Sequence, residues 1–94
     1  MKTDCQTGKT TQQLINAPKD SFFVWCNSDF HYPKQLCSKL NRPDIRLIGP
    51  SDIAYKVRGL RVPVIIDHHA YHLVSDSDLD FIRVHNHKAG YNGN

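Results

Sequence analysis

The apolar residues of this chain gather in four short runs that polar segments separate. Three of the runs are residues 21–26, 45–48 and 62–67, and the first is continuous rather than alternating. A strand that is buried on both faces, as in a parallel sheet, has this pattern. The fourth run, residues 79–84, has similar length and apolar character, so it predicts a fourth strand.

The segments between these runs indicate helices. Residues 8–16 predict a short helix that Pro18 ends, because proline cannot continue a helix. Residues 32–40 place apolar side chains at helical spacing, and residues 51–59 predict a third helical or irregular piece. Strands that alternate with helices require crossover connections. The pattern therefore predicts a small three-layer α/β domain with a mainly parallel sheet of about four strands.

Length and composition limit the possible organisation. The 94 residues suit a single domain, 1–94, whose glycine- and asparagine-rich end, residues 88–94, is expected to be a flexible tail. No apolar run reaches the length of a membrane span and no signal peptide is visible, so we expect a cytoplasmic protein without membrane contact. Three widely spaced cysteines, at positions 5, 26 and 37, favour reduced thiols over a zinc site.

The segment Thr7-Gly8-Lys9-Thr10-Thr11 carries the first candidate chemistry. Backbone N–H groups at the start of a helix bind anions, and the helix dipole favours negative charge there. In a phosphate-binding loop of this kind, the lysine reaches the terminal phosphates and the hydroxyl of Thr10 binds magnesium. The alternative is an ordinary polar loop, because the tripeptide Gly-Lys-Thr is short.

Asp67 is the second candidate, because it directly follows the apolar run that ends in Val64-Ile65-Ile66. In P-loop proteins, an aspartate at the end of such a strand holds magnesium through water. The order along the chain and the separation from Lys9 both fit this arrangement. The alternative is a polar residue that only ends a buried strand.

The stretches TGKTTQQLI, FFVWCNSDFHYPKQLCSKL, DIRLIGPSDI and KVRGLRVPVIIDHHA resemble the small P-loop NTPase-like proteins of phages. They also resemble the first part of a RecA-like helicase and terminase ATPase core, here in degenerate form. The resemblance covers about residues 6–70. It implies that Gly8, Lys9, Thr10 and Thr11 bind nucleotide phosphate and that Thr10 and Asp67 hold Mg²⁺. ATP or another nucleotide with Mg²⁺ is then the implied cofactor, in a phage protein of the host cytoplasm.

Three positions depart from that pattern. Thr3 stands where the first loop glycine is expected, and only Met1 and Lys2 precede the loop in place of a full first strand. His68 stands where hydrolysing members carry a glutamate that activates water, so weak or absent hydrolysis is expected. The missing strand leaves unpaired backbone groups in the sheet. We expect a rearranged sheet, a second copy of the chain or a partner protein to cover them.

The segment Asp67-His68-His69-Ala70-Tyr71-His72 supports a different reading. Aspartate and histidine side chains together are ligands for manganese, zinc or iron. The spelling VIIDHH also resembles the motif of the DHH phosphoesterases, although this chain is short for their two-domain fold. A metal-dependent phosphoesterase built on Asp67, His68 and His69 is therefore one alternative function.

A third class of function needs no catalysis. The chain could be an inhibitor or adaptor that binds a host protein or a nucleic-acid machine. Its net charge of +3 permits contact with nucleic acid but does not indicate it, because the basic residues are spread along the chain. Partners from the host or the phage, nucleic acid and a second copy of the chain all stay open at this point.

Overall fold

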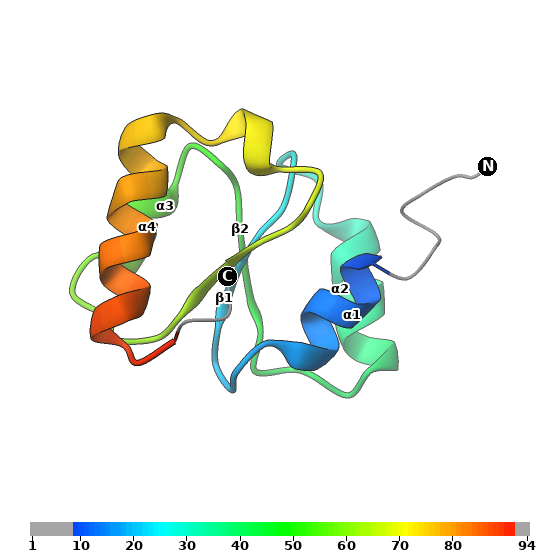
Figure 1. Ribbon diagram of the computed structural model, residues 1–94. Coiled ribbons are helices and arrows are strands. Elements are labelled where there is room, and N and C mark those ends of the chain that lie inside the picture. The colour runs from blue at the N-terminus through cyan, green and yellow to red at the C-terminus, as the bar shows by residue number, and fades with distance from the viewer. Residues whose placement is uncertain (1–8, 92–94) are drawn as a thin grey trace.

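The computed structural model describes residues 9–91. Three strands form a parallel sheet in the order β2-β1-β3, and helices cover both of its faces (Figure 1). The strands are β1 (Phe22–Val24), β2 (Arg46–Ile48) and β3 (Val64–Ile66). The helices are α1 (Lys9–Asn16), α2 (His31–Lys39), α3 (Ile53–Val57) and α4 (Asp76–Lys88), with a 3₁₀ turn, η2, at Tyr71–Leu73. The prediction of a small α/β domain with a parallel sheet is confirmed.

Burial on both faces explains why β1 and β3 are continuous apolar runs. Phe22 and Val24 pack into the cluster beneath α3 and α4, together with Ile66. Phe23 and Trp25 point the opposite way, into the cluster beneath α1 and α2. Successive strand side chains alternate between faces, so a strand between two helical layers needs an apolar residue at every position.

The fourth predicted strand is wrong, because residues 79–84 lie within α4. The Ser75 hydroxyl accepts a hydrogen bond from the Asp78 N–H at 3.2 Å and caps the start of this helix. Asp76 and Asp78 in the first turn, and basic side chains in the last, complement the helix dipole. Among the described residues the sheet therefore has three strands. The apolar content of 79–84 fits a helix face as well as a strand.

Two carboxamide side chains cover the outer edge of β3. Asn86 of α4 accepts from the Val64 N–H at 2.8 Å and donates to the Val64 C=O at 2.9 Å. Gln13 of α1 donates to the Ile66 C=O at 2.8 Å and accepts from the His68 N–H at 3.1 Å. Each amide group both donates and accepts, as the peptide group of a neighbouring strand would.

The covered edge is the place where a strand preceding α1 would lie. The chain passes from β1 through α2 to β2 on one face of the sheet, and α1 lies on that same face (Figure 1). A right-handed crossover into β1 through α1 would therefore start beyond β3. Residues 1–8, where the stub of that strand was predicted, lie outside the described residues.

The segment after α4 returns to the sheet. Gly90 has a positive φ of 81°, which ends the helix. Tyr91 then donates its N–H to the Asn86 C=O at 2.8 Å and packs against the cluster beneath α1 and α2. Residues 92–94, the rest of the tail predicted to be flexible, lie outside the described residues. No helix within 9–91 has the length and apolar character that crossing a bilayer requires.

Candidate functional site

The first turn of α1 meets the carboxyl end of β3. The Thr10 hydroxyl donates a hydrogen bond to Asp67 Oδ1 at 2.8 Å, across a sequence separation of 57 residues. Both residues are fully buried. Ligands of parallel α/β domains bind at the carboxyl ends of the strands, and this pair lies at that end of the sheet. Two residues singled out from the sequence as magnesium ligands are thus direct neighbours.

The Asp67 carboxylate is held by a set of short contacts. Its Oδ2 accepts from the His69 N–H at 3.0 Å and lies 3.2 Å from His69 Nδ1. Its Oδ1, which Thr10 contacts, lies 3.6 Å from His68 Nδ1. The backbone N–H of Asp67 continues the sheet by donating to the Val24 C=O at 3.1 Å. Both carboxylate oxygens therefore have fixed directions, as a buried carboxylate requires.

His68 has only one nitrogen in polar surroundings. Its Nδ1 lies 3.3 Å from Gln13 Oε1 and 3.6 Å from the Asp67 carboxylate, and both are acceptors. These contacts favour a proton on Nδ1, which leaves Nε2 as the unprotonated nitrogen. Nε2 is buried and has no hydrogen-bond partner among the described residues. The free lone pair of His68 therefore faces the protein interior.

The other predicted phosphate-binding residues have different surroundings. Lys9 is exposed and its ammonium group makes no ion pair with any residue from 9 to 91. Thr11 is half-buried, and Gly8 lies outside the described residues. The first turn of α1 contains no acidic side chain that would occupy its N–H groups. These N–H groups and Lys9 form the positive side of the candidate site.

Arg42 holds the opposite end of α1. Its guanidinium group donates to the Leu14 C=O at 2.8 Å and the Pro18 C=O at 3.2 Å, and forms two bonds with Asp44, at 2.8 and 3.1 Å. Hydrogen bonds from Arg42 and from the Asp20 N–H hold the pKa of Asp44 well below its usual range. This group of contacts fixes α1, and with it Thr10, against the rest of the domain.

The same site contains a group of metal-binding side chains. Ligand atoms of Asp67, His68 and His69 all lie within 4.8 Å of one another, and within 9–91 these residues form the one such group. The two imidazole rings pack together, with centroids 3.9 Å apart. Two further histidines lie outside this group. His72 is exposed, and His85 is turned toward the Val62 C=O, 2.7 Å from its Nε2.

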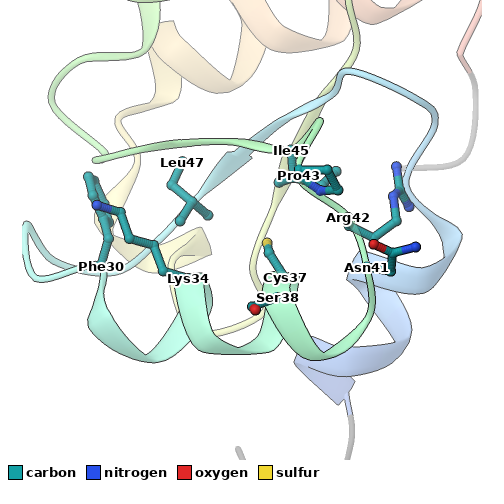
Figure 2. A pocket seen from close by; sticks show the side chains of 9 residues that line it. All are labelled: Phe30, Lys34, Cys37, Ser38, Asn41, Arg42, Pro43, Ile45 and Leu47. Atoms are coloured by element: carbon teal, nitrogen blue, oxygen red, sulfur yellow. The ribbon is translucent and has the colours of Figure 1, made fainter.

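A separate hollow of about 530 Å³ lies between α2 and the segment that leads into β2 (Figure 2). Phe30 and Lys34 lie at one end of it and Asn41 and Arg42 at the other, while the Cys37 sulfur points into its middle. Burial raises the pKa of the Cys37 thiol. A thiol in such surroundings is a poor nucleophile, so this hollow is suited to binding rather than covalent chemistry.

No family model, no curated protein and no solved structure matches the chain.

Three residues that organise the site were not singled out from the sequence. Gln13, Arg42 and Asn86 bond to backbone groups 22 to 55 residues away. The neighbouring sequence does not predict these contacts, since polar side chains in helices and loops are usually exposed. The position of Gln13 in the same short helix as Thr10 is the one available clue.

Proposed function

We propose that this chain binds a nucleotide or another phosphate compound together with Mg²⁺, with weak or absent hydrolysis. The observation that supports this most is the 2.8 Å contact between Thr10 Oγ1 and Asp67 Oδ1. Hydroxyl and carboxylate oxygens suit Mg²⁺, which prefers hard oxygen ligands and keeps several of its waters. The donor set therefore fits the ion that the P-loop resemblance implies. A role as a phage accessory protein is part of the same proposal.

Each residue has a distinct role in this proposal. Thr10 and Asp67 would hold the ion, which would screen the charge of the phosphate oxygens. The N–H groups of the first turn of α1 would donate to phosphate oxygens, and the helix dipole favours the negative charge there. Lys9, exposed and without an ion pair among the described residues, would add a mobile positive charge. Gln13 and Arg42 would keep α1 in register with β3.

Weak hydrolysis is part of the proposal because of His68. A general base must reach its water directly and must have a free lone pair. The favoured proton position leaves Nε2 as the basic nitrogen of His68, and that atom is buried. His68 would therefore orient the Asp67 carboxylate and Gln13 rather than activate water.

Calorimetric titration with ATP and with a non-hydrolysable analogue, each with and without Mg²⁺, tests the proposal. Binding should require Mg²⁺ and should weaken about tenfold or more in Lys9→Ala, because a charge-assisted contact to phosphate is lost. Lys19→Ala is the matched control, since Lys19 is equally exposed and lies beyond the end of α1. The absence of binding to the wild-type chain, or equal binding by Lys9→Ala, would overturn the proposal.

A second candidate is a metal-dependent phosphoesterase, favoured by the group of Asp67, His68 and His69. A carboxylate with two imidazoles suits Mn²⁺ or Zn²⁺ better than Mg²⁺. The three ligand atoms lie within 4.8 Å of one another, close enough for one ion to bind between them after small side-chain rotations. In this reading the bound metal would supply an activated water.

The two candidates predict different dependence on single residues. Hydrolysis of a nitrophenyl phosphodiester with Mn²⁺ should be lost in Asp67→Asn and His69→Asn and unchanged in Lys9→Ala. His72→Asn is the control, since His72 is exposed and lies outside the ligand group. Hydrolysis that survives in His69→Asn would exclude this candidate, and loss in Lys9→Ala would favour the nucleotide site instead.

A further inference from the structure

The two edges of the sheet differ in whether side chains bond to their outward backbone groups. Side-chain amides cover the outer edge of β3, as described above. At the other edge, the Arg46 N–H donates to the Ser21 C=O, and the Ile48 C=O accepts from the Trp25 N–H, both at 2.9 Å. These bonds turn the peptide groups of Arg46 and Ile48 toward β1. In a parallel ladder the intervening residue, Leu47, directs its N–H and C=O outward.

No described residue bonds to the outward N–H and C=O of Leu47. A strand edge of this kind is a template for another extended chain. The hollow of about 530 Å³ lies along this edge, and Leu47, Ile45 and Phe30 contribute apolar surface to it (Figure 2). An added strand would therefore find backbone partners and an apolar recess in the same place.

The two faces of the edge differ in chemistry. Leu47 points toward α2 and packs against the cluster on that face. Arg46 points to the other face, where its guanidinium carbon lies 5.5 Å from the centre of the Phe22 ring. Arg46 is exposed and makes no ion pair with a residue in the described part of the chain. Alternate side chains of an added strand would contact the apolar recess on one face and the Arg46 guanidinium group on the other.

We propose that the edge of β2 binds an extended, acidic peptide segment of a partner protein by strand addition. Apolar side chains at every second position would enter the recess beside Leu47. Glutamate or aspartate at the positions between them would pair with Arg46. Lys34, exposed at one end of the recess, would add a second positive charge for the same partner.

A second copy of this chain is a poorer occupant. Two-fold antiparallel pairing of β2 with itself would place both Arg46 side chains on the same face of the joined sheet. Like charges on neighbouring strands oppose pairing. An acidic peptide avoids this repulsion, because its carboxylates attract Arg46.

The test is titration of the ¹⁵N-labelled chain with a peptide of about seven residues in which valine and glutamate alternate. The Leu47 amide signal should shift on binding, while the Val64 and His68 amides should not. A lysine version of the peptide should bind about three- to tenfold more weakly, and Arg46→Glu should reverse that preference. Arg58→Glu is the matched control, since Arg58 is exposed and lies after α3.

N-methylated peptides make the backbone contact testable without altering the protein. In an extended strand the N–H groups of alternate residues point to opposite edges. Methylating the valine amides and methylating the glutamate amides should therefore differ, with one series losing binding about tenfold or more. Equal affinity of both series would overturn strand addition. Indifference to the Glu-to-Lys change would overturn the acidic partner, and self-association without peptide binding would favour a second copy.

Discussion

At Thr10, a buried hydroxyl group donates to one oxygen of a carboxylate that water does not reach. Thr10 and Asp67 are both fully buried, and the hydroxyl is 2.8 Å from Asp67 Oδ1. A buried charged acceptor depends strongly on its donors, because desolvation is not offset when a donor is lost. The same contact that suggests magnesium binding therefore also contributes to folding.

Thr10→Val is expected to lower the free energy of unfolding by about 1–3 kcal/mol, because the valine side chain keeps the volume but removes the donor. Thr10→Ser keeps the hydroxyl and should lose less. Urea unfolding followed by circular dichroism measures both variants. A Thr10→Val protein as stable as the wild type would mean that Asp67 finds another donor.

Asp44 should make the free energy of unfolding depend on pH in the acid range. Its pKa in the folded chain is lowered, chiefly by the hydrogen bonds from Arg42. Its contribution is therefore fully present above the unfolded pKa of about 3.9 and is lost as the pH falls below that value. Asp44→Asn should lower the urea midpoint at pH 7 and flatten the decline that begins below about pH 4 and continues toward the lowered folded pKa.

The control for this experiment is Asp76→Asn, because Asp76 is exposed at the start of α4. The stability of Asp76→Asn should still fall at acid pH almost as much as that of the wild type. An Asp44→Asn variant whose stability falls with acid as steeply as that of the wild type would assign the pH dependence to other carboxylates.

At the scale of elements, α4 shows how a capping residue decides between helix and strand. The run Leu79 to Val84 is apolar enough for either, and its composition alone predicts a strand over residues 79–84. Ser75 and the acidic first turn begin a helix four residues earlier, and Gly90 ends it. Local hydrogen bonds at the ends outweigh the apolar content of a short middle segment.

Ser75→Ala is expected to destabilise the domain by about 1 kcal/mol, because the Asp78 N–H loses its acceptor. Ser77→Ala tests the specificity of this effect, since Ser77 lies in the same turn and is exposed. Thermal unfolding of the two variants makes the comparison. Equal melting temperatures would show that Ser75 does not act as a cap in solution.

At the scale of the whole molecule, Asn86 joins α4 to the outer edge of β3. Asn86→Leu would remove the two side-chain bonds to the Val64 N–H and C=O, at an expected loss of about 2–4 kcal/mol. The uncovered edge should also promote association. Urea unfolding and sedimentation at several protein concentrations would measure the two effects.

His87→Leu provides the control for added apolar surface, because His87 is the exposed neighbour of Asn86 in α4. It should retain the stability and the association state of the wild-type chain. If both variants associate to the same degree, the added leucine rather than the uncovered edge is responsible.

The sequence supports the fold better than it supports the contacts within the site. The strands β1 and β3 could be predicted because burial on two faces requires continuous apolar residues, as at Phe22 and Phe23. The strand β2 could be predicted from the apolar residues on either side of its exposed Arg46. The neighbours Thr10 and Asp67 were named together through a resemblance to P-loop proteins. The roles of Gln13, Arg42 and Asn86 could not be predicted, because they depend on which backbone groups the finished topology leaves uncovered.

The side-chain amides of Gln13 and Asn86, which bond to β3, should affect the outcome of mutational scans. Only a carboxamide offers a donor and an acceptor in the geometry of a peptide group, and aspartate, glutamate and leucine each lack one or both. In a saturation screen, positions 13 and 86 should therefore tolerate almost no substitution, as active-site residues do. Asn86 would show this intolerance through its bonds to Val64, in α4 rather than in the helix that carries Thr10. Substitutions at the edge of the sheet would then reduce fitness as strongly as substitutions in the candidate site.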